Sequence, residues 1–314
     1  MLKYIIKRIL IALPVLIGIT ILDFLIMNLA GSPLEMMIGP KTTQAALQAK
    51  EIQLGLDKPL YVQYFLWLKN VLQGNLGYSI KSYQPVSQII GEHLGPTLLL
   101  MGTSLIVGLI IAIPIGIYSA VHRYTKRDYA FVTMSFFGTS IPSFFLALIL
   151  IYIFTVNLGW LPSSGMITAG GDGGIIDILR HMIMPVLVLS ISIAGSNIRY
   201  VRSAVLEILQ MDYIRTAKSK GIGRYLTINR HAIRNALLPI VTVIGMQIPT
   251  LFGGAVIIEQ VFSWPGLGLI TMNAITGRDY PVIMGVGLLT AVVVLAANLI
   301  TDIVYALVDP RIKY

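Results

Sequence analysis

Six long apolar segments divide the chain and constrain its fold more than any other feature. Each is about 20 residues or longer, which is enough for an α-helix to cross the hydrocarbon core of a bilayer. Only 12% of the 314 residues are charged and 56% are hydrophobic, whereas a soluble domain carries about 25% charged residues. The sequence therefore predicts an all-α integral membrane protein with six transmembrane helices, at residues 9–28, 97–121, 129–158, 182–201, 236–258 and 282–307.

Several prolines lie inside these segments. In lipid, neighbouring helices can satisfy the carbonyl groups that a proline leaves free, so such prolines are tolerated within a span. We therefore expect kinks rather than breaks between domains, and a single transmembrane domain over residues 1–314. The prolines concerned are Pro14, Pro114, Pro142, Pro185 and Pro249.

The positive charges are distributed unevenly between the two sides of the membrane. With six spans and the N-terminus inside, 16 of the 23 Lys and Arg fall on the inner side, and the two short outer loops hold only Arg180 and Arg278. Short inner loops are enriched in Lys and Arg. This predicts that both termini are cytoplasmic, and it explains the net charge of +9 without a nucleic-acid partner.

The sequence also lacks the motifs of several chemistries. It contains no cysteine, its four histidines are far apart, and no phosphate-binding loop or catalytic triad is visible. We therefore expect no resident metal, no cofactor and no enzymatic activity.

The segment at residues 29–96 is predicted to form a small helical cap on the outer face. Turn residues separate two helix-like stretches, at 43–54 and 60–73. In the second stretch Tyr64, Trp67, Leu68 and Val71 recur at helical spacing. The stretch is rich in aromatic residues, which favours an ordered cap over a disordered loop.

The inner loop at residues 199–236 is much longer than a connection between two spans requires. Asp212 begins a helical pattern that Gly221 ends. Tyr213, Ala217 and Gly221 share one expected face, and its small residues favour docking into a protein groove over resting on lipid headgroups. The residues expected to form this docking helix are Asp212, Tyr213, Arg215, Thr216, Ala217, Lys218, Lys220 and Gly221.

This loop carries a family resemblance. The runs DYIRTAKSKG from 212 and HAIRNALLP from 231 resemble the cytoplasmic loop of ABC importer permeases of the dipeptide, oligopeptide and nickel branch, of the DppB/OppB/AppB type. Their general signature, Glu-Ala-Ala, three residues and Gly, falls on Arg215, Thr216, Ala217 and Gly221. The missing Glu and the long distance from Gly221 to Pro239 are departures typical of the peptide branch.

The resemblance covers the whole chain. It includes LGLDKPLYVQYFLWL at 54–68, GNLGYS at 74–79, IPSFFLALIL at 141–150, LGWLPSSG at 158–165, EQVFSWPGLG at 259–268 and VDPRIKY at 308–314. One departure is the run from Ala30 to Pro33, where relatives often carry Pro-Gly-Asp-Pro.

The resemblance implies a type I ABC importer permease in a prokaryotic cell membrane. The expected partners are a second homologous permease subunit, two cytoplasmic ABC ATPase subunits and an extracytoplasmic substrate-binding protein. Peptides are the leading substrate, and nickel or another small solute is the alternative. A secondary transporter is the alternative from another class, but inverted repeats and midplane charges, which that class would show, are not evident.

Polar residues within the spans are candidates for the wall of the pathway, because such residues are costly in lipid. Helix–helix hydrogen bonding would explain the uncharged ones equally well, and a structural or interfacial role would explain the carboxylate. The candidates are Asn197, Gln247, Asn298 and Asp302.

Overall fold

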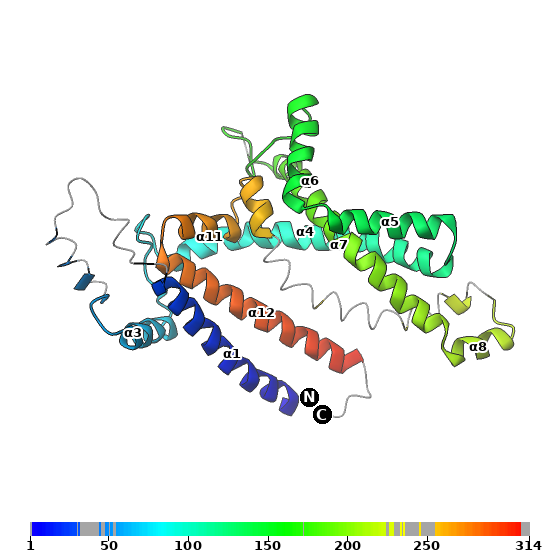
Figure 1. The fold of residues 1–314 in the computed structure, drawn as a ribbon, viewed down its shortest axis with the longest axis horizontal. Helices are drawn as coiled ribbons and strands as arrows, with labels where there is room; N and C mark the ends of the chain where they lie inside the picture. The colour runs from blue at the N-terminus through cyan, green and yellow to red at the C-terminus, as the bar shows by residue number, and fades with distance from the viewer. Residues whose placement is uncertain are drawn as a thin grey trace. The chain divides into compact units, whose positions relative to one another are not determined.

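A computed structural model describes residues 2–29, 31, 51–52, 55–171, 173–223, 226–228 and 255–308, with further single positions at 44, 48, 49, 233, 235 and 245. These residues form helices joined by turns (Figure 1). The elements are α1 (Leu2–Leu29), α3 (Leu60–Leu72), α4 (Val86–Val121), α5 (Lys126–Ser140), α6 (Ser143–Leu150), the π-helix η2 (Ile151–Asn157), α7 (Ile175–Leu209), α8 (Asp212–Ser219), α11 (Leu267–Thr276) and α12 (Tyr280–Val308).

Four of the predicted spans are single helices. α1, α4, α7 and α12 are each long and apolar enough to cross a membrane. α4 begins at Val86, so the last residues of the predicted outer cap belong to a helix that continues into the span. The predicted span at 236–258 lies mostly outside the described residues, and its last part, 255–258, is helical.

The predicted span at 129–158 is not one continuous helix. It consists of α5 followed by α6 and η2, and the two parts are bent by 95° at residues 141–142. Ile141, which precedes Pro142, has φ −76° and ψ 123°, because a residue before proline is driven from the helical region towards extended backbone. The expectation of a mere kink at Pro142 was therefore wrong, whereas Pro14 and Pro185 do lie inside continuous helices.

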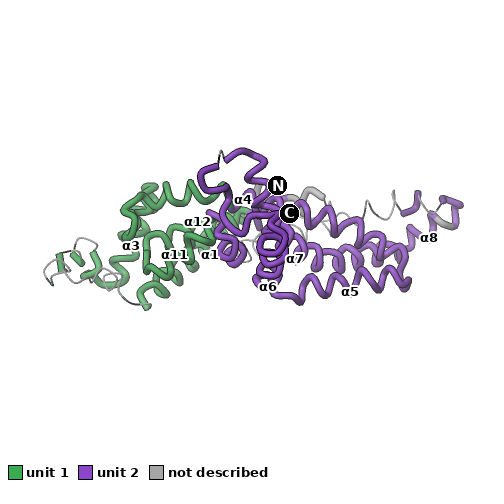
Figure 2. The backbone as a smooth tube through the Cα atoms, turned by 90° about the horizontal axis from the view of Figure 1, so that it is seen from above, with its two compact units in different colours: residues 1–96, 266–296 green, residues 97–265, 297–314 purple. Residues whose placement is uncertain are grey.

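The chain divides into two compact units (Figure 2). Unit 1 comprises Met1–Pro96 and Gly266–Ala296, and unit 2 comprises Thr97–Pro265 and Ala297–Tyr314. Two of the three boundaries fall within α4 and α12, so both helices contribute residues to both units, and the third falls just before α11.

Unit 2 is organised around α7, which packs against α4 and α5. Small residues recur at every fourth position along α4, at Ser104, Gly108, Ala112, Gly116 and Ala120. A Cβ added at Gly108 would lie 2.7 Å from Ile193 Cγ2 on α7, and one added at Gly195 on α7 would lie 2.7 Å from the Ser135 carbonyl oxygen on α5. Stripes of small residues allow membrane helices to approach this closely, and van der Waals contact then holds them together.

Unit 1 contains the part of the predicted outer cap that the structure describes. The predicted helix at 60–73 is confirmed as α3, and Tyr64 packs with Phe24 of α1 and Met284 of α12 in a small core, against which Trp67 and Leu68 also pack. The Asp279 carboxylate accepts hydrogen bonds from the Ser79 hydroxyl and from the Ile80 N–H. The predicted helix at 43–54 lies mostly outside the described residues.

Candidate functional site: the coupling helix and its support

The helix predicted to begin at Asp212 and to end at Gly221 is present as α8 (Asp212–Ser219) and follows α7 after a two-residue turn. At its C-terminal end, the Ile222 N–H donates to the Ala217 carbonyl at 3.2 Å, and Gly221 has φ +77°. This is the geometry of a Schellman motif, in which a residue in the left-handed region ends the helix. The predicted end of the helix at Gly221 is therefore confirmed.

The exposed side of α8 differs from the predicted one. Ile214 and Ala217 are buried within the chain, whereas Asp212, Arg215 and Thr216 are exposed. Ala217 therefore does not share an open face with Tyr213 and Gly221, which are exposed. The physical reason is that Ile214 and Ala217, one turn apart, form the apolar side by which this short helix rests on its own chain.

Two lysines complete the predicted set. Lys220 is exposed just beyond the last turn, and the side chain of Lys218 lies outside the described part of the chain. Thr216 and Ser219 donate their hydroxyls to the carbonyls of Asp212 and Arg215, four residues earlier. The side of α8 that faces away from the rest of the chain, called its outer side below, therefore presents Asp212, Tyr213, Arg215 and Thr216.

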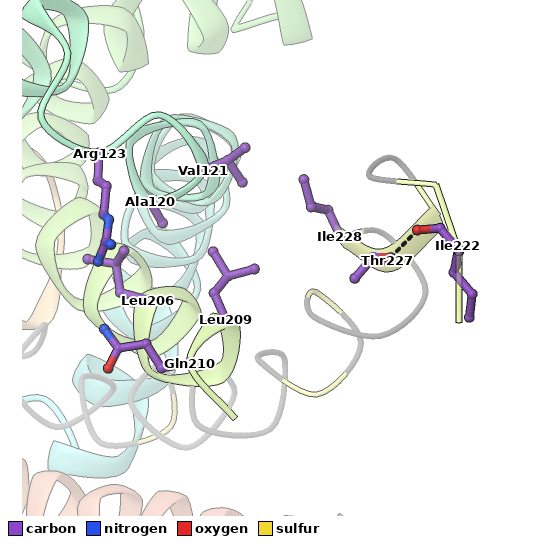
Figure 3. A pocket seen from close by; sticks show the side chains of 10 residues that line it. Ala120, Val121, Arg123, Leu206, Leu209, Gln210, Ile222, Thr227 and Ile228 are labelled. Atoms are coloured by element: carbon purple, nitrogen blue, oxygen red, sulfur yellow. Dashed lines mark hydrogen bonds between the residues drawn. The ribbon is translucent and has the colours of Figure 1, made fainter. Parts of the chain in front are cut away.

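A cavity of about 540 Å³ lies between the ends of α4 and α7 on one side and the segment that follows α8 on the other (Figure 3). Arg123 is the charged residue in its described wall, and Gln210 and Thr227 are polar. The Thr227 hydroxyl donates to the Ile222 carbonyl at 3.2 Å. The ends of α4 and α7 thus face the segment after α8 across this space, whose described lining is Ala120, Val121, Arg123, Leu206, Leu209, Gln210, Gly221, Ile222, Thr227 and Ile228.

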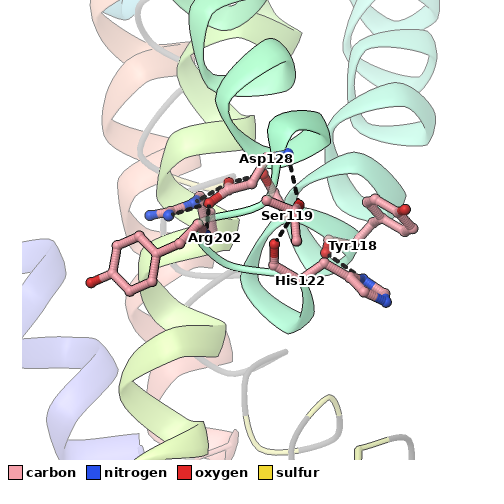
Figure 4. Close-up of polar contacts among 7 residues, drawn as sticks. Tyr118, Ser119, His122, Asp128 and Arg202 are labelled. Atoms are coloured by element: carbon pink, nitrogen blue, oxygen red, sulfur yellow. Dashed lines mark hydrogen bonds and ion pairs between the residues drawn. The ribbon is translucent and has the colours of Figure 1, made fainter.

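A buried ion pair lies where α4, α5 and α7 meet (Figure 4). Arg202 of α7 donates from Nε and Nη2 to the two carboxylate oxygens of Asp128 in α5, both at 2.8 Å. The Ser119 hydroxyl donates to Asp128 Oδ1 at 2.5 Å and the Tyr124 N–H to Oδ2 at 2.9 Å. Each carboxylate oxygen thus accepts two hydrogen bonds, which offsets the cost of burying the charge.

This cluster was not predicted from the sequence. Arg202 was considered only as one of the positive charges of the inner loop, and Asp128 was not considered. One signal was available in the sequence. Thr125 and Asp128 have the spacing of an N-cap and its third helical residue, and the Thr125 hydroxyl does accept from the Asp128 N–H at 3.3 Å. The pairing with Arg202, 74 residues later, requires the tertiary structure.

The four pathway candidates have different surroundings. Asn197 on α7 is buried, and its Nδ2 donates to the Ile193 carbonyl at 2.8 Å. On α12, Asn298 is exposed and Asp302 is half-buried. Gln247 lies outside the described residues. The intrahelical bond of Asn197 fits a structural role as well as a pathway role.

A second buried carboxylate was also missed by the sequence reasoning. Glu259 is fully buried, next to the apolar core that contains Ile258, Phe262 and Trp264, and it accepts from the Thr97 hydroxyl at 2.7 Å. Among the described residues, no group of three or more His, Cys, Asp or Glu could hold a metal ion.

Comparison with known proteins identifies the family. Residues 112–314 match the model of the binding-protein-dependent transport system inner membrane component, and residues 1–101 match its N-terminal counterpart. The chain is 47% identical to a peptide permease protein of Brucella ovis, covering 100% of this chain and 99% of that protein. It is 46% identical to the oligopeptide transport system permease protein AppB of Bacillus subtilis, and 38% identical to the glutathione transport system permease protein GsiC of Salmonella typhimurium, with 100% of each chain covered.

Solved structures agree on the fold. Two inward-facing structures of the MetNI methionine ABC transporter match with TM-scores of 0.56 and 0.59, at 19% and 21% identity. Each match covers 71% of this chain and 97% of the other. The long apolar helices, the loop with α8 and the matches along the whole length lead to one conclusion: the chain is a multi-pass membrane protein that belongs to the family of inner membrane components of binding-protein-dependent transport systems, in the peptide permease branch of the ABC importers.

Proposed function

We propose that this chain forms part of the pathway by which an ATP-driven importer carries peptides across the membrane. It would pair with a second homologous permease subunit, and an extracytoplasmic binding protein would deliver the peptide. Two cytoplasmic ATPase subunits would bind ATP and Mg²⁺, so this chain would need no cofactor and would not be an enzyme. Both termini would be cytoplasmic, as the distribution of positive charges indicates.

The exposed side of α8 supports ATPase docking on this helix. Its charged and polar side chains, Asp212, Arg215 and Thr216, are open to a partner, and Ile214 and Ala217 hold the helix against its own chain. The Schellman end fixes the direction in which the chain leaves. Only Gln210 and Met211 separate α8 from α7, so a movement of α8 would be transmitted directly to α7. ATP binding by the partner subunits would in this way shift the transmembrane helices between two arrangements.

The names of the relatives favour peptides over the alternatives. Three relatives that match along the whole chain are named for peptides, oligopeptides and glutathione, and glutathione is itself a small peptide. This observation is the reason for proposing peptides, rather than nickel or other small solutes, as the substrate. Asn197, Gln247, Asn298 and Asp302 stay candidates for contact with the substrate.

Uptake into proteoliposomes tests the proposal. The chain would be reconstituted with its partner permease, ATPases and binding protein, and given labelled di- and oligopeptides or nickel. We expect peptide uptake that requires both ATP and the binding protein. Uptake of nickel but not of peptides would contradict the substrate class, and uptake driven by an ion gradient without ATP would favour a secondary transporter.

A further inference from the structure

We propose that α3 lies in the interface of the bilayer, on the side where α1 ends, with one apolar face in lipid. The helix would run along the membrane surface rather than stand in water as part of a soluble cap. The inference concerns only the lipid contact of α3 and holds whichever way the chain is oriented.

The attachment of α3 to α1 sets its depth. The Tyr64 hydroxyl is hydrogen-bonded to the Thr20 hydroxyl at 2.9 Å, and the Tyr64 ring meets Phe24 edge-on at 5.6 Å. α1 is a candidate span that ends at Leu29, and Thr20 lies nine residues before that end, about 14 Å along the helix axis. α3 lies beside the C-terminal end of α1 (Figure 1), and a helix whose anchor reaches this far down a spanning helix cannot be clear of the bilayer.

The side chains of α3 fall on three faces. Tyr64, Trp67 and Leu68 pack towards α1 and α12. At 100° per residue, Tyr61, Phe65 and Leu72 form a stripe within about 40° on one flank, and they are 66%, 63% and 79% exposed. Gln63 and Asn70 lie on the opposite flank, and Gln63 Nε2 donates to the carbonyls of Leu56 and Lys58.

This arrangement suits a lipid surface. With the packing face turned towards α1, the apolar stripe and the polar flank point to opposite sides, as a helix lying along a membrane surface requires. Tyrosine side chains such as that of Tyr61, which have an apolar ring and a polar hydroxyl, are favoured at the level of the headgroups. Lys69 is exposed between the two flanks, where its long stem can carry the ammonium group to water. In water, a stripe of this kind would leave three large apolar side chains unprotected.

Site-directed spin labelling tests this placement, and this chain itself adds no background labelling because it contains no cysteine. Single variants Tyr61→Cys and Phe65→Cys, with Asn70→Cys as the matched control on the opposite flank, would be labelled in the full chain, purified with its partner subunits. The complexes would be placed in phosphatidylcholine nanodiscs. Accessibility to oxygen, which concentrates in lipid, and to a nickel chelate, which stays in water, would then be compared.

We expect oxygen accessibility to exceed nickel-chelate accessibility at positions 61 and 65, and the ratio to reverse at position 70. The depth of the label at 65 should be about 5–10 Å below the headgroup boundary. High nickel-chelate accessibility at 61 and 65 would mean that the stripe faces water, and low accessibility to both reagents would mean that a protein partner covers it. Either result overturns the proposal, and the two labelled positions guard against a local folding defect at one of them.

Discussion

Two Arg–Asp pairs in neighbouring helices show how differently this chain uses the same chemistry. Arg202 and Asp128 are joined by two hydrogen bonds of 2.8 Å, and their side chains are 22% and 2% exposed. Arg215 and Asp212 approach to 3.7 Å, and their side chains are 77% and 96% exposed. The first pair lies where three helices meet, and the second lies on the outer side of α8.

The difference in exposure indicates two roles: the buried pair stabilises the packing of the helices, and the exposed pair is available for contact with a partner protein. A buried pair cannot be broken without leaving an uncompensated charge, whereas an exposed pair contributes about 0–1 kcal/mol and leaves both groups free to rearrange. The buried cluster therefore holds the end of α4 and the start of α5 against the last turns of α7, which leads into α8. The charges on α8 add little to stability, and so they can serve a partner.

The largest effect is expected at Arg202. Arg202→Met should destabilise the chain by about 3–5 kcal/mol, because Asp128 stays buried without its partner. The thermal unfolding midpoint of the purified complex would measure this loss. The double variant Asp128→Leu with Arg202→Met removes both charges and should recover much of the midpoint. Equal damage from the single and the double variant would show that the ion pair itself is not what holds the helices.

A smaller but clear effect is expected at Ala217. Ala217→Asp places a carboxylate on the buried side of α8, where desolvation opposes its charge. We therefore expect α8 to detach from the rest of the chain and peptide uptake to fall strongly. Ser219→Asp is the matched control, since it puts the same charge on the same helix at an exposed position outside the residues expected to dock. Peptide uptake and ATPase stimulation by the loaded binding protein would be measured for both. If Ser219→Asp proves as harmful as Ala217→Asp, burial does not explain the result.

Gly221 should show a graded response. Non-glycine residues in the left-handed region cost about 1–2 kcal/mol, and Asn costs less than other residues. No atom of the described chain lies within 4 Å of an added Cβ at this position, so the cost comes from the backbone and from any docked partner. Uptake should fall in the order Gly, Asn, Ala, Val, with abundance in the membrane nearly unchanged. Wild-type uptake by Gly221→Val would argue against a role for this helix end.

The smallest effect on stability is expected at Arg215. Arg215→Glu breaks a pair that is open to solvent, so the unfolding midpoint should change by an amount equivalent to less than about 1 kcal/mol. A drop comparable to that of Arg202→Met would erase the contrast between the two pairs.

The sequence predicts the helical membrane fold because long apolar segments have few other solutions. It also predicts α3, α8 and the end of α8 at Gly221, because helix periodicity and glycine stops are local signals. The sequence does not predict the 95° bend at Pro142, because a proline within an apolar segment is compatible with either a kink or a complete break of the helix. It misses the buried Asp128, and it places Ala217 on the wrong side of α8. Burial depends on contacts between residues far apart in the chain, and a small residue fits either side of a helix.

Photo-crosslinking tests the central claim, that the outer side of α8 docks the ATPase, most directly. Single cysteines at Tyr213 and Thr216 would carry a benzophenone in the assembled importer, with a cysteine at the exposed Tyr152 of η2 as the control. We predict a crosslinked product with the ATPase subunit from positions 213 and 216, and none from position 152. An importer that transports peptide normally and yields only lipid adducts from both α8 positions would contradict the account.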